Sequence, residues 1–185
     1  MKHKIVLGLL TQIDSHLVEM LKEGIEHTFN CPVEIKARIG SLDYAYATKR
    51  KQYLAPLILS TLRGFSTNAD DRCLGVVDVD LYSPGSSFVF GEADIGSRVA
   101  VISLYRLRPE RYGLAPDERL YQSRVTKEAV HELGHTHYLS HCLEAKCVMH
   151  LSHSLADTDR KAAAFCPNCE QGLQEVVVNR DTTTT

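Results

Sequence analysis

The 185-residue sequence lacks a long apolar run, a strong excess of charge and any internal repeat. No stretch approaches the roughly 20 apolar residues that a membrane-spanning helix needs, which excludes that class of membrane protein. The formal net charge of −2 predicts no affinity for nucleic acids or other polyanions. The apolar run near the start is only about six residues long and no small-residue cleavage site follows it, so we expect no signal peptide and a cytoplasmic location.

Segments with strand-like and helix-like periodicity alternate along the first two thirds of the chain. Strands are expected at residues 5–10, 33–39, 74–81, 87–92 and 100–104, and helices at 15–27, 54–62 and 117–136. This alternation predicts a single α/β domain built on a mixed, mostly parallel twisted sheet. The segment FVFGEA, Phe88 to Ala93, is the best candidate for an antiparallel edge strand. An edge strand could bind an extended peptide through its unpaired main chain, or have no ligand at all.

The most informative stretch, HELGHTHYLSHCLEAKCVM, runs from His131 to Met149. Histidines four residues apart, such as His131 and His135, lie on one face of a helix and can bind one metal ion. Glu132 follows the first of them, where its carboxylate can reach a water on the metal. His141 lies six residues further on, about 240° round and about 9 Å along an unbroken helix, so it reaches the same metal only if the helix ends first.

Three other histidines lie close to this site in the sequence. His150 and His153 are rival third ligands, but they lie beyond the methionine that ends the stretch, so His141 is preferred. His137 is about 200° from His135 on a helix and is expected to point away, toward solvent or a backbone partner. Three histidine ligands leave the fourth zinc position open, which a catalytic site requires.

Four of the six cysteines lie within twenty-eight residues of one another, namely Cys142, Cys147, Cys166 and Cys169. A Cys-x4-Cys pair followed by a Cys-x2-Cys pair is a spacing typical of a structural zinc site with four thiolate ligands. Two disulfide bonds are the weaker alternative, because no secretion signal is present. Cys31 and Cys73 stand alone and are expected to be buried thiols.

The stretch resembles the metzincin signature, His-Glu-x-x-His-x-x-Gly-x-x-His followed by a Met-turn. The cysteine directly after the third histidine, the later cysteines and the FVFGEA segment are similar to one branch of that group, the archaemetzincins. The signature glycine falls on Tyr138, so the residue that normally permits the sharp turn is absent. A left-handed conformation at Tyr138 costs roughly 1–2 kcal/mol. We nevertheless expect His141 to bind the metal, because an anchored Cys142 would hold the returning chain in place.

The resemblance implies a zinc-dependent metallopeptidase with two zinc ions per chain. The catalytic zinc would be held by His131, His135 and His141, and the structural zinc by the four clustered cysteines. Glu132 would be the general base, which takes a proton from the zinc-activated water and passes it to the leaving amine. Met149 would form an apolar floor beneath the histidines.

The resemblance also implies how the chain is divided and what it binds. Residues 1–141 would form an upper subdomain with a backing helix and the active-site helix. Residues 142–180 would form a small lower subdomain stapled by the structural zinc. Independently of the resemblance, the low-complexity end Asp-Thr-Thr-Thr-Thr, residues 181–185, is expected to be a disordered tail. A peptide or protein substrate would bind along the Phe88–Glu92 edge strand, at the upper rim of the cleft. We expect a monomer that binds neither membranes nor nucleic acids.

Two other functions could use the same residues. A non-catalytic protein could use the four-cysteine site to present a surface to a protein or nucleic-acid partner. However, a purely structural three-histidine site has no use for the adjacent Glu132 carboxylate. A zinc hydrolase that acts on a non-peptide amide would differ from a peptidase only in its substrate.

Overall fold

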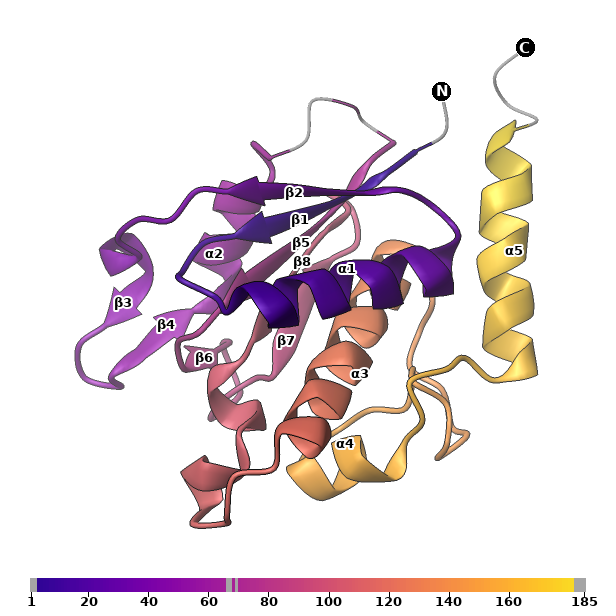
Figure 1. The fold of residues 1–185 in the computed structure, drawn as a ribbon. Helices are drawn as coiled ribbons and strands as arrows, with labels where there is room; N and C mark the ends of the chain where they lie inside the picture. Colours follow the sequence, from indigo (N-terminus) through magenta and orange to yellow (C-terminus); the bar gives the residue numbers. More distant parts are fainter. Residues whose placement is uncertain (1–2, 66–67, 69, 182–185) are drawn as a thin grey trace.

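The computed structural model describes residues 3–65, 68 and 70–181, of which 176–181 are described by their backbone alone. A five-stranded sheet with the order β2-β1-β5-β8-β7 forms its centre (Figure 1). The first four strands in this order run parallel, and β7 pairs antiparallel with β8 at one edge. The strands are β1 (Ile5–Leu9), β2 (Val33–Ala37), β5 (Arg72–Val77), β7 (Gly91–Asp94) and β8 (Val99–Ser103). The predicted mixed, mostly parallel α/β sheet is confirmed.

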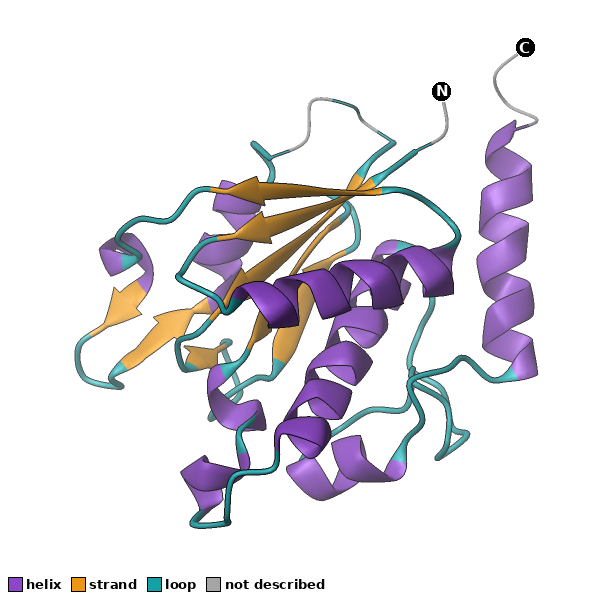
Figure 2. Ribbon diagram, in the orientation of Figure 1, coloured by secondary structure: helices purple, strands orange, loops and turns teal. Residues whose placement is uncertain are grey.

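Helices cover both faces of this sheet (Figure 2). Helices α1 (Ser15–Phe29) and α3 (Glu118–Thr136) lie on one face, and α2 (Ala55–Leu62) lies on the other. Because successive side chains of a strand point to opposite faces, Leu7 of β1 packs in the core with α1 and α3, whereas Val6 packs with α2. β1 is therefore buried along its whole length, as expected for a parallel strand covered on both sides.

A second, small sheet joins β3 (Tyr46–Ala47), β4 (Gln52–Leu54) and β6 (Leu81–Tyr82). The single strand predicted at 74–81 is therefore wrong, because β5 and β6 are separate strands. Two aspartates lie between β5 and β6 and form ion pairs with arginines from the connection after β8. Asp78 pairs with Arg108 and Asp80 with Arg106, each with a contact of 2.6 Å.

The antiparallel edge strand begins later than the sequence predicts. A strand is expected at 87–92, but pairing of β7 with β8 starts at Gly91. Val89 pairs instead with Leu81 of β6, which belongs to the small sheet. The residues just before Gly91 therefore connect the two sheets.

Short helices fill the long connections. Helix η1 (Asp43–Ala45) precedes β3, and the connection after β8 contains η2 (Tyr105–Leu107) and η3 (Pro109–Tyr112). Within the part of the chain that the structure describes, no helix is both long enough and apolar enough to cross a membrane.

Two unpredicted helices follow α3, namely α4 (Leu155–Arg160) and α5 (Pro167–Asp181). Helix α4 begins with a capping box, in which the side chains of Ser154 and Asp157 accept hydrogen bonds from each other's backbone N–H groups. Asp181, the first residue of the predicted disordered tail, is the last residue of α5. Residues 182–185, the rest of that predicted tail, lie outside the described residues.

Candidate functional site

Helix α3 contains the first part of the histidine motif and is firmly held. Its N-cap residue, Asp117, accepts a hydrogen bond of 2.9 Å from the backbone N–H of Leu120. From Val125 to the end of the helix almost every residue is buried. His131 and Glu132 are therefore positioned by a packed helix rather than by a loop.

The helix ends in a Schellman motif, with Tyr138 at the left-handed position of that motif. The φ angle of Tyr138 is 67°. Its backbone N–H donates to the His135 carbonyl at 2.9 Å, and the N–H of Leu139 donates to the Gly134 carbonyl at 3.1 Å. Tyrosine therefore adopts the conformation that glycine adopts more readily, and the chain turns sharply back.

His137 is buried, which corrects the expectation that it could point to solvent; a backbone partner stays a prediction. Its ring stacks on Phe29 of α1, with ring centroids 4.9 Å apart and an interplanar angle of 17°. The helical spacing misleads here because His137 is the cap residue, with φ −94° and ψ 18°, and no longer follows the helix.

The turn brings three rings together, here named the histidine cluster (His131, His135 and His141). The ring centroids of His131 and His135 are 4.7 Å apart, and that of His141 lies 5.4 Å and 4.8 Å from them, respectively. One ligand nitrogen from each ring lies within 4.8 Å of the others. The Nε2 atoms of His131 and His135 are 3.2 Å apart. Two nitrogens bound to one tetrahedral zinc at about 2.0 Å would be about 3.3 Å apart.

Backbone carbonyl groups fix the tautomers of two of these rings. Nδ1 of His131 lies 2.8 Å from the Val148 carbonyl oxygen, and Nδ1 of His135 lies 2.7 Å from that of Leu139. A carbonyl oxygen only accepts, so Nδ1–H donates in both cases and Nε2 keeps its lone pair for a metal. Burial lowers the pKa of both imidazoles, that of His131 to about 2, and so favours the neutral form that binds metals.

The Glu132 side chain occupies a buried space that depends on a glycine. A Cβ atom on Gly91 of β7 would lie 2.5 Å from Cγ and 2.7 Å from Oε1 of Glu132, so any larger residue would displace the carboxyl group. Burial raises the pKa of Glu132 well above its ordinary range, and the nearby Glu128 carboxylate adds to the rise. A carboxyl group with a raised pKa can both accept and release a proton closer to neutral pH.

Met149 packs beneath the end of α3 against another glycine. The methionine is fully buried, and a Cβ atom on Gly134 would overlap its sulfur. The Met149 carbonyl accepts a hydrogen bond of 2.9 Å from the backbone N–H of Cys142. Met149 therefore lies under the helical turn that joins His131 to His135.

A cleft of about 640 Å³ adjoins the histidine cluster. One side is formed by residues 85–93, which lead into β7, and the other by residues 151–153. Glu132 and the three clustered histidines line it, together with Glu128 and Glu92. The cleft thus combines a possible metal site, a buried carboxyl group and an edge strand.

The two rival third ligands lie outside the histidine cluster. Nδ1 of His150 is 3.0 Å from the Cys142 carbonyl oxygen, so this ring is turned toward the cysteine-containing loop. His153 lines the cleft, but its ring is not within the group of three. Among the described histidines, His141 is the one that the turn at Tyr138 brings to His131 and His135.

The four clustered cysteines also meet, and are here named the cysteine cluster (Cys142, Cys147, Cys166 and Cys169). Their sulfur atoms all lie within 4.8 Å of one another, and Sγ of Cys142 is 3.7 Å from Sγ of Cys166. Two thiolates on one tetrahedral zinc at about 2.3 Å would be about 3.75 Å apart. A hydrogen bond from the backbone of Cys169 lowers the pKa of Cys166 to about 7, whereas burial raises the pKa of Cys147 and that of Cys169. All six cysteines lie in the described residues and none forms a disulfide.

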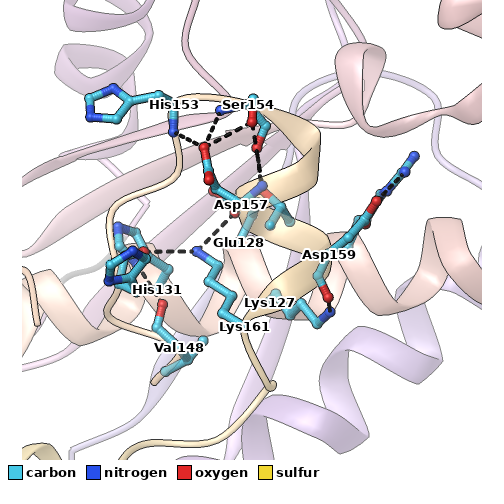
Figure 3. A network of polar contacts seen from close by, with 12 residues as sticks. Lys127, Glu128, His131, Val148, His153, Ser154, Asp157, Asp159 and Lys161 are labelled. Carbon is cyan, nitrogen blue, oxygen red and sulfur yellow. Dashed lines mark hydrogen bonds and ion pairs between the residues drawn. The ribbon is translucent and has the colours of Figure 1, made fainter. Parts of the chain in front are cut away.

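A buried ion pair beside the histidine cluster is not predicted by the sequence (Figure 3). The Lys161 side chain is fully buried, and its Nζ lies 3.1 Å from Oε1 of Glu128. Glu128 is three residues before His131, and this spacing is a signal that could have placed it on the same helix face. The sequence around Lys161 holds no comparable signal.

Known proteins share both the sequence and the arrangement of this chain. The family model described as peptidase family M54 matches residues 7–175. The archaemetzincin of Pyrococcus furiosus is 41% identical over 184 residues, which cover 95% of this chain and 94% of that protein. The archaemetzincin of Pyrococcus horikoshii is 47% identical over 149 residues, which cover 77% of this chain and 79% of that protein.

Solved structures agree with the sequence relatives. The crystal structure of archaemetzincin from Methanopyrus kandleri matches with a TM-score of 0.82 at 40% identity, and the match covers 95% of this chain and 96% of that one. The structure of a zinc-dependent peptidase from Methanocorpusculum labreanum gives a TM-score of 0.84 at 30% identity, over 91% of this chain and 99% of that one.

Proposed function

This chain belongs to peptidase family M54, the archaemetzincin family, and from that premise we propose that the histidine cluster holds a catalytic zinc ion and that Glu132 is the general base. As a member of that family the protein is a zinc metallopeptidase, which acts on a peptide or protein substrate. The observation that carries the proposal is the pair of Nε2 atoms, 3.2 Å apart, each left with a free lone pair by the hydrogen bond at Nδ1.

The donor set of the histidine cluster suits zinc. Neutral imidazole nitrogens are common zinc ligands, and three protein ligands leave a fourth position for water or substrate. His131 and His135 would bind from one face of α3, and His141 from the chain that returns after Tyr138. When bound, a zinc ion supplies a Lewis acid that polarises a carbonyl group and lowers the pKa of water.

Glu132 would move the proton during hydrolysis. Its carboxylate accepts a proton from the attacking water, holds it on a carboxyl oxygen and passes it to the nitrogen of the leaving amine. The raised pKa of Glu132 supports both steps, because a stronger base takes up the proton more readily and a weak acid can still release it. Close packing against Gly91 keeps the carboxyl group in one place.

The substrate is proposed to lie extended along Phe88–Glu92. β7 is the last strand of the sheet in the described part of the chain, so its outer side at Gly91 and Glu92 is available for main-chain hydrogen bonds with a peptide, whereas Val89 already pairs with Leu81 of β6. The proposed upper subdomain, residues 1–141, and lower subdomain, residues 142–180, would then flank the cleft.

The cysteine cluster is proposed to hold a second, structural zinc ion, which gives two zinc ions per chain. Four thiolates complete a tetrahedron and leave no position for substrate. Cys142 directly follows His141, and Cys147 is two residues before Met149. A metal in this cluster would therefore hold both the third histidine and the methionine in place.

The Glu132→Ala variant tests the role of the carboxyl group. Zinc-loaded parent protein is first incubated with a diverse peptide library, and cleavage is identified by mass spectrometry. On the best peptide, we expect the variant to lose about 10²–10⁴-fold in kcat, while its zinc content and Tm stay close to those of the parent. Glu118→Ala, which removes an exposed carboxylate from the first turn of the same helix, is the matched control and should keep full turnover. Equal turnover of parent and Glu132→Ala would remove Glu132 from the mechanism.

A further inference from the structure

Glu128 brings a second carboxyl group to the histidine cluster. It lies three residues before His131 on α3, so the two side chains share one helix face, and both line the cleft. A free carboxylate in this position would compete with water and substrate for a divalent metal. It also raises the pKa of Glu132, the neighbouring buried acid. The site therefore needs a device that neutralises Glu128 and directs it away from the metal.

Lys161 supplies the opposite charge. Its side chain is 0% exposed and that of Glu128 is 3% exposed, and the two charged groups are 3.1 Å apart. Thr158, in α4, donates its hydroxyl to the same Oε1 atom of Glu128 at 3.3 Å. In Figure 3 a dashed contact runs from the Lys161 ammonium group to Glu128. The Glu128 carboxylate is thus held by two donors from the segment that ends α4.

The Lys161 ammonium group also contacts the segment that contains Met149. Lys161 Nζ donates to the His150 carbonyl at 3.4 Å. Two residues earlier, the Val148 carbonyl accepts the hydrogen bond from His131. Helix α3 is therefore attached to the two residues that flank Met149, once directly through His131 and once through the Glu128–Lys161 pair.

Stability alone does not explain this pair. A buried ion pair is often no more stabilising than apolar side chains of similar volume, because both charges must leave water. A lysine whose side chain is completely buried beside a carboxylate in a cleft therefore indicates a requirement of the site. Lys161 also opposes the rise in the pKa of Glu132, so its charge reaches the proposed base.

We propose that the Lys161–Glu128 pair is a positioning element of the active site, which keeps the Glu128 carboxylate out of the metal coordination and holds the Met149 segment beneath the histidines. Lys161 is thus a positioning residue that acts through Glu128, and Glu132 remains available to act at the metal. This inference rests on the proposed metal-binding function of the histidine cluster.

The test uses the full-length protein with cobalt(II) exchanged into the histidine cluster, while zinc is retained in the cysteine cluster. In Lys161→Met the freed Glu128 carboxylate should join the metal, and the added ligand should weaken the visible absorption of cobalt. The zinc form of this variant should lose about 10–100-fold in kcat, as expected for loss of a group that orients metal ligands, with little change in KM. The double variant Lys161→Met/Glu128→Gln should regain the parent spectrum and most of the turnover, because no unpaired charge is left.

Lys127→Met is the matched control. Lys127 is also a buried lysine of the same network and donates to the Asp159 carbonyl at 3.3 Å, but it makes no hydrogen bond or ion pair with Glu128 among the described contacts. This variant should change Tm without changing the cobalt spectrum or kcat. An equal effect of Lys127→Met and Lys161→Met would overturn the proposal, as would a double variant no better than Lys161→Met alone.

Two further outcomes are also decisive. If Lys161→Met does not fold, a folded double variant with the parent spectrum supports the proposal, and an unfolded one overturns it. The cobalt spectrum is read whether or not any peptide is cleaved. A parent histidine cluster that binds no cobalt therefore rejects the proposed metal site itself, whereas a cobalt-binding parent with an unchanged Lys161→Met spectrum rejects only the role of Lys161.

Discussion

The histidine cluster and the cysteine cluster bring their ligands together in different ways. The three histidines come from eleven consecutive residues, and two of them lie on one face of a buried helix. The four cysteines are spread over twenty-eight residues, and three of them lie outside helices altogether. The histidines line the cleft, whereas no cysteine is among the described residues that line it.

The difference suggests separate roles for the two sites. The fold would position the histidine cluster, whereas a metal in the cysteine cluster would contribute to folding. A packed helix fixes the positions of His131 and His135, and backbone carbonyl groups hold their Nδ1 atoms. Cysteines on turns have no such support, and in other proteins a metal in a site of this kind contributes directly to folding. The cysteine cluster should therefore dominate stability, and the histidine cluster activity.

The largest expected effect is at Cys166. We expect Cys166→Ser to remove about one of two zinc ions per chain and to lower Tm sharply, since a structural zinc contributes on the order of 10 kcal/mol to folding in small zinc domains. Metal analysis and thermal unfolding measure the two effects. Cys31→Ala removes a buried thiol outside the cluster and should keep both ions. A parent protein with a single zinc ion, or unchanged zinc content in Cys166→Ser, would show that the cysteine cluster does not hold a second zinc ion.

The next effect should appear in activity without a loss of metal. Gly91→Ala places a methyl group 2.5 Å from the present position of Glu132 Cγ, so the carboxyl group must move. A displacement of about 1 Å at a catalytic group can cost about 10²-fold in turnover, and we expect a loss of that order in kcat. Gly96→Ala, where the added methyl group would lie 3.5 Å from Oδ1 of Asp94, is the control in the same hairpin. Loss of zinc from Gly91→Ala, or full activity in it, would show that Gly91 does not act through Glu132.

The isolated thiols, Cys31 and Cys73, lie outside the cysteine cluster and are buried. Burial raises the pKa of Cys73 to about 12, from an ordinary value of 9.0. The unfolded chain releases this proton first, so the stabilisation is complete below pH 9 and is lost as the pH rises toward 12. The free energy of unfolding of the parent should therefore fall more steeply with pH than that of Cys73→Ala, by at most about 1.4 kcal/mol per pH unit. Urea unfolding between about pH 8 and pH 10 measures both slopes; parallel slopes would be inconsistent with a buried, protonated Cys73.

The smallest effect is expected at Tyr138. Glycine adopts the φ of 67° without strain but also gives the unfolded chain more freedom, so Tyr138→Gly should be neutral or stabilising by at most about 1 kcal/mol. Tyr138→Ala keeps the backbone strain while removing the ring, and so separates the two contributions. Zinc content and unfolding free energy are the measurements. A metal-bound structure in which His150 or His153 replaces His141 would overturn the ligand assignment.

Features set by local spacing could be predicted, and they include the central elements of the candidate site. Asp117 caps α3 where the sequence places the start of a helix, and the four-residue spacing of His131 and His135 fixes their common face. The return of His141 could be inferred only from the resemblance, because Tyr138 does not favour the turn that it makes.

Features set by contacts between distant segments could not be predicted. The pairing of Val89 with Leu81 delays the start of β7, and no periodicity within either segment reveals it. The burial of His137 against Phe29 depends on the packing of α1 on α3. Lys161 is the clearest case, since lysine is usually exposed and its partner Glu128 lies far from it in the sequence, on α3.

One short segment, Cys147 to Met149, contacts both clusters. Cys147 contributes a sulfur to the cysteine cluster, while the carbonyl of the next residue, Val148, orients His131. If a metal in either cluster orders this segment, the two sites are coupled, and each metal changes the affinity for the other by the same factor. Loss of the metal from the cysteine cluster would then weaken metal binding at the histidine cluster.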